Sequence, residues 1–497
     1  MKRIIFLVLA LAMAALTLYA AGRSEPSAPA GVKTISYLYN AGSGFTSDDN
    51  NPVLQKVEQS IGVKVDMIFS APGDYNSKLN TLIASRQLPD LFTSGASDVQ
   101  SFSQEGMIVN LSNYISQYGS NLEREIGPAY RSSPVNKNGI YMICGNGDRM
   151  LENLCVRVDW LRNLGLSMPT DLDSLYNVLY GFTYNDPDRN GRDDTVGIVF
   201  TMTQNNQWDV LFGAFGIAYN RAYQLANGTV TTYMKAPAYL DAIEYLRKLY
   251  QNGVMDQEFA TMPAMSAHEA LWTGRCGVYG FRAPGTTNNW YPGRYTFDVP
   301  ADPAEMFGYT DIKGPQGFHG ASKVYGSMSS GFVVSSTARY PEACVQFLDF
   351  MATPEGDILM YLGVEGLMFE WIDKNAGTYQ RLGPYVDDTY HRASGGFTYF
   401  ASFRNEGADL LTMNKLTREA QAFARENTFD WPYIYTPFDE AAEYGTTLND
   451  ITAEALARLI VTTGNVQSEY QAFVRRWETE GGLEWERGAT AAYRSQQ

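Results

Sequence analysis

The sequence predicts an α/β protein of two lobes, each assembled from segments that are not adjacent in the chain. Residues 34–92 alternate between extended apolar runs and helical runs, which is the order of a parallel sheet covered by helices. Extended stretches near residues 139–158 and 324–335 interrupt this order, and we interpret them as passages between the lobes. The length of 497 residues fits two large lobes as well as three domains of ordinary size.

The predicted lobe boundaries follow from these passages. The first lobe is expected to comprise residues 33–140 and 332–385, and the second lobe residues 156–325 and 386–497. Because several strands then connect the lobes, one lobe can rotate against the other without either core unfolding. The sequence therefore predicts a clamshell that closes by a hinge movement.

The chain begins with the features of an export signal. Lys2 and Arg3 precede an apolar run over residues 4–18, and small residues suited to cleavage end the segment at Gly22. Residues 1–22 are therefore interpreted as a signal peptide, and the Pro- and Ser-rich residues 23–32 as a linker. The apolar run is too short for a membrane span, so we expect an exported protein that is periplasmic or secreted.

The first lobe is expected to open with three strands joined by two helices. The predicted strands are 34–39, 62–69 and 88–92, and the predicted helices are 52–60 and 75–86. Ligands bind beyond the carboxyl ends of the strands in such a sheet. Residues 39–45 and 92–97 are therefore expected at the mouth of this lobe.

Three helices follow from apolar spacing in the later chain. Thr170 is the predicted N-cap of one helix, with Asp173 as its capping partner, and apolar residues recur after it at helical intervals. A second helix is predicted over 238–250, where Asn252 and Gly253 provide the stop. A third is predicted over 341–351, with a proline in its first turn.

The loop after the first of these helices has the spacing of a calcium site. Oxygen-bearing side chains occupy its first, third, fifth and ninth positions, a glycine occupies the sixth, and a backbone carbonyl falls at the seventh. The predicted ligands are Asp186, Asp188, Asn190, the carbonyl of Arg192, and Asp194. Position twelve is Gly197 where a calcium loop has a bidentate Glu, so we expect a structural Ca²⁺. An unfilled loop of hydrogen-bonded turns is the alternative.

Several motifs together resemble a known family. Arg157-x-Asp-Trp-Leu-x-x-Leu-Gly-Leu is followed by Pro-Thr and by the Asp-Pro-Asp-x-Asn-Gly loop, and further matches are Leu88-Pro-Asp, Trp272-Thr-Gly and Tyr361-Leu-Gly-Val-Glu-Gly. This pattern resembles the family 1 extracellular solute-binding proteins of ABC importers, particularly their large LipO-like and alginate-oligosaccharide-binding members. The resemblance covers most of residues 33–480.

The resemblance implies a fold, a function and partners. The fold would be the type II periplasmic-binding-protein clamshell. The function would be delivery of a carbohydrate, specifically an oligosaccharide, to the membrane permease of an ABC importer, by a monomer without catalytic activity. Members of the family often carry a lipid-anchoring Cys at the cleavage site. The first Cys of this sequence is Cys144, so we expect no such anchor.

Charge and motif content exclude some functions and leave others open. The formal net charge of −16 repels phosphate backbones, so nucleic-acid binding is not expected. The three histidines form no His-x-x-x-His spacing, and the sequence has no Gly-x-Ser-x-Gly elbow. Carboxylates are abundant, so a secreted glycoside hydrolase remains an alternative. A receptor for a peptide or another small solute on the same scaffold is a further one.

Tryptophans are the candidate platforms for a sugar ring, since flat amphipathic rings suit stacking. Trp290 is the first choice because it lies in a polar loop after a predicted strand. The other candidates are Trp208, Trp371 and Trp431, and each of the four could instead be a packed aromatic. Asp48 and Asp90 could bind sugar hydroxyls or simply form turns.

Four cysteines leave the disulfide pattern open. Export would permit disulfides, and Cys144, Cys155, Cys276 and Cys344 allow three pairings. Cys144 and Cys155 are close enough in sequence to pair across a hairpin. Cys344 lies on an apolar helix face and is expected to be a buried thiol.

Overall fold

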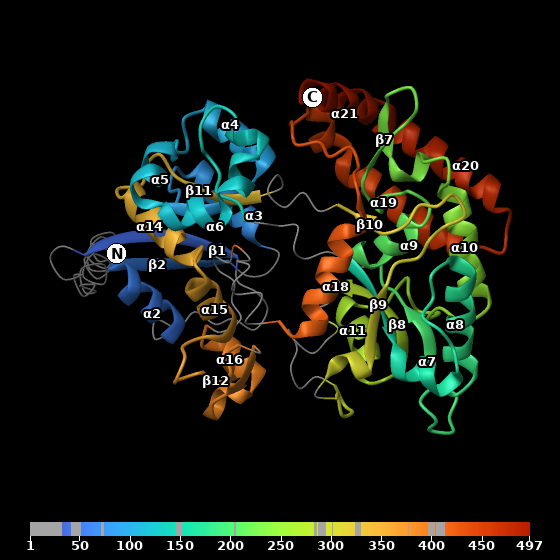
Figure 1. The fold of residues 1–497 in the computed structure, drawn as a ribbon. Helices are drawn as coiled ribbons and strands as arrows, with labels where there is room; N and C mark the ends of the chain where they lie inside the picture. Colours follow the sequence, from blue (N-terminus) through green and yellow to red (C-terminus); the bar gives the residue numbers. More distant parts are fainter. Residues whose placement is uncertain are drawn as a thin grey trace, which may run out of the picture.

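The computed structural model forms two lobes, each organised around a four-stranded sheet (Figure 1). It describes residues 32–40, 51–70, 74–145, 152–202, 205–282, 286, 295–300, 302–323, 330–375, 377–395, 403 and 413–497. In this part of the chain no helix is long and apolar enough to cross a membrane. The α/β, two-lobed fold predicted from the sequence is confirmed.

The sheet of the first lobe has the strand order β11-β3-β1-β2. Its strands are β1 (Lys33–Asn40), β2 (Val63–Ser70), β3 (Leu91–Gly95) and β11 (Ser330–Val334). The strand β1 pairs in parallel with β2 and β3, and β11 runs antiparallel to β3. The predicted strand–helix alternation therefore yields the predicted parallel sheet, and the late strand β11 completes its edge.

Helices cover this sheet on both faces, as the parallel order requires. They are α2 (Pro52–Ile61), α3 (Tyr75–Ala84), α4 (Ala96–Gln104), α5 (Ser112–Tyr118), α6 (Ser120–Arg131), η1 (Pro134–Asn136), α14 (Pro341–Met351) and α15 (Pro354–Leu362). The helix α2 begins where the Asn51 side chain accepts from two backbone N–H groups, and it ends at Gly62 with φ 69°. Its apolar face buries Val53 and Val57.

A buried carboxylate ties the early and late parts of the first lobe together. Asp349 on α14 accepts hydrogen bonds from the backbone N–H of Asn121 (2.7 Å) and of Leu122 (2.9 Å). It also accepts one from the Asn121 side chain at 2.7 Å. These bonds satisfy free N–H groups in the first turn of α6, where a negative charge is favoured. The discontinuous lobe is therefore joined by specific bonds as well as by its apolar core.

The sheet of the second lobe has the order β5-β8-β4-β9 and mixed direction. Its strands are β4 (Glu152–Arg157), β5 (Val196–Val199), β8 (Cys276–Arg282) and β9 (Phe307–Thr310). The strand β5 runs parallel to β8, and β4 runs antiparallel to both β8 and β9. All six residues of β4 are buried, because helices and loops cover both faces of this sheet.

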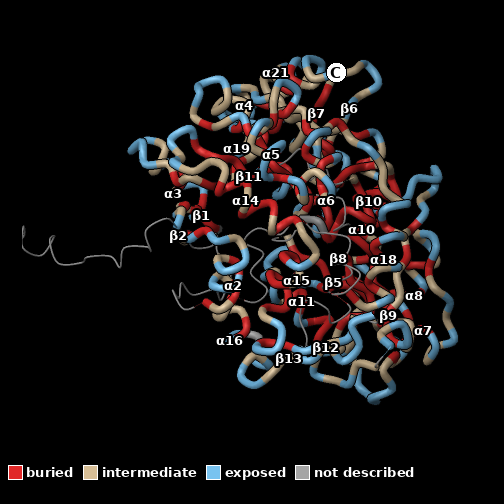
Figure 2. The backbone as a smooth tube through the Cα atoms, turned by 60° about the vertical axis from the view of Figure 1, so that its left-hand side comes forward, coloured by how far each residue is buried: buried red, intermediate tan, exposed pale blue. Residues whose placement is uncertain are grey.

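The remaining elements of the second lobe are mostly helical. They are α7 (Val158–Leu164), α8 (Leu172–Tyr184), η3 (Asn205–Trp208), α9 (Asp209–Gly213), β6 (Ala222–Gln224), β7 (Val230–Thr232), η4 (Tyr233–Lys235), α10 (Tyr239–Gln251), α11 (Ala264–Trp272), η5 (Pro303–Glu305), β10 (Ala321–Ser322), α18 (Lys415–Glu426), β14 (Thr428–Phe429), α19 (Asp439–Val461), α20 (Val466–Trp477), η7 (Glu478–Gly482) and α21 (Leu483–Ser495). Figure 2 shows buried backbone along β8 and β10, with exposed segments around α7 and α8.

The start of α8 corrects one sequence prediction. The N-cap is Asp171, whose side chain accepts from the Ser174 N–H, while the Ser174 hydroxyl accepts from the Asp171 N–H. The predicted cap, Thr170, lies one residue earlier, and Asp173 is not the capping partner. Asp and Ser form the same reciprocal arrangement as the predicted pair, so the motif was found with the wrong residues.

The elements around the boundary predicted at residue 386 are short. After α15 come β12 (Phe369–Asp373), β13 (Thr378–Arg381), η6 (Gly383–Val386) and α16 (Asp388–Ala393). His391 on α16 bonds to the carbonyl of Leu362 at 2.9 Å. The ring of Phe403 packs edge-on against Phe332 of β11 at 5.2 Å. Leu362 and Phe369 share a buried cluster with Cys155 and Phe307 of the second lobe, so these elements contact both lobes and the boundary at residue 386 stays a prediction.

All four cysteines are buried, and none forms a disulfide. Cys144 belongs to the core of the first lobe, whereas Cys155 lies on β4 of the second lobe in a different buried cluster. The suggested pairing of these two residues across a hairpin is wrong, because the chain changes lobe between them. Cys344 is buried on α14, as its position on an apolar helix face predicted.

Candidate ligand-binding site

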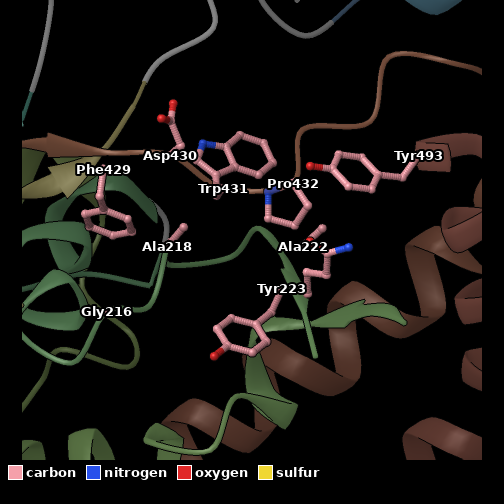
Figure 3. Close-up of a pocket in the computed structure, with 10 residues that line it drawn as sticks. Gly216, Ala218, Ala222, Tyr223, Phe429, Asp430, Trp431, Pro432 and Tyr493 are labelled. Carbon is pink, nitrogen blue, oxygen red and sulfur yellow. The ribbon is translucent and has the colours of Figure 1, made fainter. Parts of the chain in front are cut away.

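A pocket of about 470 Å³ opens in the second lobe (Figure 3). Three parts of the chain line it: the segment from α9 to β6, the end of β14 with the loop that follows, and α21. The lining residues are Gly216, Ala218, Ala222, Tyr223, Gln224, Phe429, Asp430, Trp431, Pro432 and Tyr493. Figure 3 shows the rings of Trp431 and Tyr493 on one side of the pocket and Tyr223 below them.

Trp431 is half-buried and held in a fixed orientation. Its Nε1–H donates to the carbonyl oxygen of Lys323 at 2.8 Å. The guanidinium of Arg221 lies over the indole at 5.3 Å from the ring centroid, and Tyr433 packs edge-on at 5.2 Å. Such contacts fix the plane of an indole before any ligand arrives. A ring oriented in advance loses little conformational entropy on binding.

The backbone that carries Trp431 is fixed by a short parallel ladder. The strand β10 pairs with β14, and the N–H of Lys323 donates to the carbonyl of Phe429 at 2.9 Å. Lys323 is also the last described residue before the chain reaches β11 of the first lobe. The indole hydrogen bond therefore ends on the segment that connects the two lobes.

A buried carboxylate holds β10 from its other side. Asp209 accepts from the Ser322 N–H (2.8 Å), the Ser322 hydroxyl (2.7 Å) and the Tyr219 N–H (3.1 Å). Burial raises the pKa of Asp209, and its hydrogen bonds oppose that rise. The close packing here requires glycine: a Cβ at Gly320, where φ is 85°, would lie 1.7 Å from the carbonyl oxygen of Asn427.

The pocket combines aromatic faces with a few polar groups. Tyr223, Phe429, Trp431 and Tyr493 offer ring surface, while Gln224 and Asp430 offer hydrogen-bonding atoms. The Asp430 carboxylate is exposed and lies 3.4 Å from the ammonium of Lys323. This chemistry suits a ligand with apolar faces and many hydroxyl groups, because the faces stack on the rings and the hydroxyls bond to the polar atoms.

A smaller pocket of about 260 Å³ lies behind this one, on the other side of Ala222. Arg221, Tyr233, Trp477 and Trp485 are among its lining residues. Arg221 therefore lines this second, rear pocket while its guanidinium lies over the indole of Trp431.

The predicted tryptophans have different environments. Trp431 lines the pocket. Trp208 is fully buried: it stacks on Phe200 at 4.3 Å, packs against Phe259 at 5.8 Å, and donates its Nε1–H to the Thr201 carbonyl. No ring face of Trp208 is open to a ligand, so the prediction of a platform at Trp208 is corrected to a core role.

The other predicted residues lie away from this pocket or outside the described chain. Trp371 is on β12, where it packs edge-on against Phe369 and Tyr379. Asp90 accepts from the N–H and hydroxyl of Ser36 at 2.8 and 2.9 Å, and these bonds connect the residue before β3 to β1. Trp290 and Asp48 lie outside the described residues.

Sequence reasoning missed most of the pocket wall. Tyr223, Phe429 and Tyr493 were not predicted, because no local pattern connects three residues that are far apart in the chain. A usable signal was present in Phe429-Asp-Trp-Pro, an aromatic run that ends at a proline in a polar stretch. Such a run cannot continue as a helix, so its rings are displayed by a loop.

The predicted calcium loop is ordered by hydrogen bonds to Asn190. Asp186 accepts from its backbone N–H (3.0 Å), and Asp188 (2.8 Å) and Asp194 (3.1 Å) accept from its side-chain amide. Partial burial and the charges of Asp186 and Asp194 raise the pKa of Asp188. The described residues contain no group of three or more His, Cys, Asp and Glu side chains arranged to hold a metal.

The twelfth position of this loop is blocked by the fold. A Cβ at Gly197 would lie 2.7 Å from the carbonyl oxygen of Leu179 and 2.8 Å from that of Val254. No side chain can be placed there without moving the backbone. Any cation in this loop therefore relies on the first nine positions.

Comparisons with known proteins agree with this architecture. Residues 18–358 match the family model of the bacterial extracellular solute-binding proteins. Lipoprotein LipO of Bacillus subtilis is 29% identical over 376 residues, covering 73% of this chain and 74% of LipO. The polygalacturonan/rhamnogalacturonan-binding protein YtcQ of the same organism is 23% identical over 486 residues, covering 93% and 91%.

The solved structures show the same fold. The substrate-binding protein FusA of Streptococcus pneumoniae, in complex with kestose, superposes with a TM-score of 0.67 at 21% identity, covering 93% of this chain and 99% of FusA. Another structure of FusA, an EF-hand mutant with fructo-nystose, gives a TM-score of 0.65. Since the family model spans well over half of the chain, the protein belongs to the bacterial extracellular solute-binding protein family.

Proposed function

We propose that this protein is an exported receptor that binds an oligosaccharide and delivers it to an ABC importer. The observation that carries the proposal is the aromatic pocket around Trp431, whose indole is fixed at Lys323 before the passage to the first lobe. The relatives YtcQ and FusA are named as polygalacturonan/rhamnogalacturonan-binding and fructooligosaccharide-binding proteins, which supports a carbohydrate ligand.

The mechanism is a population shift between open and closed arrangements of the lobes. A ligand that contacts the Trp431 pocket and the first lobe together binds the closed arrangement more tightly, and so increases its population. The permease then distinguishes loaded from empty receptor by that arrangement. The receptor acts as a monomer, since one chain supplies both lobes.

Binding without turnover is favoured over hydrolysis by the chemistry of the pocket. Glycoside hydrolases of the usual kind place two carboxyl groups on either side of the scissile bond, about 5–9.5 Å apart. Among the described residues that line the pocket, Asp430 is the one carboxylate, and it is exposed. A peptide receptor on the same scaffold remains the second candidate.

A thermal-shift screen over oligosaccharides and peptides tests the proposal. A ligand that binds the folded state raises the melting temperature, by a free energy of about 2.7 kcal/mol at one hundred times Kd. We expect stabilisation by oligosaccharides without release of products on prolonged incubation. Stabilisation by peptides alone, or loss of the sugar chain with time, would overturn the proposal.

We further propose that the loop at residues 186–194 takes up a structural Ca²⁺. Three carboxylates converge on Asn190, and the described residues place no Lys or Arg in an ion pair with them. Turning the Asn190 amide would present its oxygen to a cation. Native mass spectrometry should show about one calcium per chain, and Asp188→Ala should lower both metal content and melting temperature. Equal melting temperatures with calcium and with chelator would contradict this.

Export is proposed from the charged and apolar residues 2–18. The first cysteine, Cys144, is buried in the core of the first lobe, so it is no site for a lipid. Fractionation and intact mass of the exported protein check both points. A mass excess equal to acyl chains, or retention in the cytoplasm, would refute them.

A further inference from the structure

We propose that the Trp431 pocket selects an uncharged sugar unit, so that the receptor takes up neutral oligosaccharides and discriminates against oligouronides. The inference rests on the proposed function and narrows its ligand class. The relatives do not decide between neutral and acidic ligands, because YtcQ is named for an acidic polysaccharide and FusA for a neutral oligosaccharide.

The first argument is the composition of the pocket wall. None of its ten described lining residues is Lys, Arg or His; four are aromatic, and Asp430 is the charged member. A uronate carboxylate is ionised at neutral pH, and desolvating it without a cationic partner is unfavourable. Sites that recognise carboxylates usually supply an Arg or Lys for this reason.

The second argument is that two cations next to Trp431 already have carboxyl neighbours. The Lys323 ammonium lies 3.4 Å from Asp430. The Arg221 guanidinium lies over the indole of Trp431, lines the rear pocket, and favours the ionised form of Asp209. Among the described residues, each of these two cations therefore has a carboxyl partner, and a uronate would compete with that partner for it.

The third argument acts at longer range. The formal net charge of the chain is −16, so an approaching oligouronide is repelled before it reaches the pocket. Salt screens this repulsion, with a Debye length of about 10 Å at 0.1 M. Binding of a neutral sugar should therefore be nearly independent of salt, whereas any uronide binding should strengthen as salt is added.

A matched pair of ligands tests the inference by calorimetry on the full exported chain. The probes are oligogalacturonides of three to five units and the same oligomers after reduction of their carboxyl groups, which changes C6 alone. Kestose and other neutral oligosaccharides widen the neutral arm. We expect each reduced oligomer that binds to bind at least tenfold more tightly than the oligogalacturonide of the same length. Kestose and the other neutral ligands that bind should bind at least tenfold more tightly than every oligogalacturonide. Tenfold corresponds to about 1.4 kcal/mol.

A positive charge introduced into the pocket tests whether this pocket is the site that discriminates between neutral and acidic sugars. Gln224 is an exposed lining residue, so Gln224→Arg should fold, and an unchanged melting temperature without ligand verifies this. The guanidinium can pair with a uronate carboxylate through two hydrogen bonds, so we expect uronide affinity to rise about tenfold. Gln224→Met is the matched control, because it removes the amide without adding charge.

The outcomes separate the inference from the function beneath it. Equal or tighter binding of the oligogalacturonides overturns the inference and leaves a carbohydrate receptor. Neutral preference with no gain of uronide affinity in Gln224→Arg overturns the assignment to this pocket. Absence of binding by every acidic and neutral oligosaccharide overturns the proposed function, and the inference with it.

Discussion

The surroundings of Trp208 and Trp431, both in the second lobe, show how one residue type serves two purposes. Trp208 is enclosed by the rings of Phe200 and Phe259, and its N–H is satisfied by a carbonyl seven residues away in sequence. Trp431 is contacted over its ring by Arg221 and at its N–H by the Lys323 carbonyl, and its ring lines a pocket. The difference teaches that availability to a ligand depends on what covers each face of the indole.

The largest expected effect comes from deleting the buried ring. Trp208→Ala should lower the free energy of unfolding by about 3–5 kcal/mol, because it removes buried apolar surface and leaves a cavity. Chemical denaturation with unchanged m-value measures this. A variant that keeps its stability but loses ligand affinity would reverse the comparison and make Trp208 a ligand contact.

The second effect is the acid sensitivity of a neighbouring buried cluster in the second lobe. His268 stacks on Trp272, and burial lowers the pKa of His268 to about 4 from an ordinary 6.5. The unfolded chain therefore binds a proton that the folded chain rejects between pH 6.5 and about 4. The stability that His268 contributes is complete above pH 6.5 and is lost as pH falls through this window, by up to about 3 kcal/mol.

The measurement is the difference between parent and His268→Gln, since other groups also titrate. The parent should lose more stability than the variant between pH 7.5 and pH 5. Equal losses in the two proteins would show that His268 is accessible to protons in the folded state.

The third effect distinguishes Trp431 from Trp208, because its removal should change ligand affinity more than stability. Trp431→Ala should weaken oligosaccharide binding by roughly tenfold, or about 1–2 kcal/mol, the range of an aromatic contact. Its effect on stability should be much smaller than that of Trp208→Ala, because the ring is half-buried. Calorimetry with a ligand from the screen checks the affinity, and unaltered binding would remove Trp431 from the site.

The contrast also shows where sequence reasoning succeeds. The first three strands and the first two helices of the first lobe were predicted within a few residues, because apolar spacing, Asn51 and Gly62 all act locally. The burial of Trp208 was not predicted, because Phe259 covers it from a distant segment. The lining residues of the pocket were not predicted for the same reason, because Tyr223 and Tyr493 come together only through tertiary packing. The contact of α16 with α15, from His391 to the Leu362 carbonyl, likewise has no local signature.

The smallest effect concerns the residue behind the pocket. Arg221 is exposed, and a cation–π contact at an exposed site contributes about 0.5–1 kcal/mol. Arg221→Gln removes the charge that lies over the Trp431 ring while the indole keeps its bond to Lys323, so affinity for a neutral oligosaccharide should fall about two- to fivefold. Arg487→Gln is the control, because it makes the same change of net charge at an exposed residue that lines a different groove. An equal loss in both variants would point to net charge. Unaltered affinity in Arg221→Gln would show that the Lys323 carbonyl alone orients the ring, and the difference between Trp208 and Trp431 would then rest on one hydrogen bond and the open face.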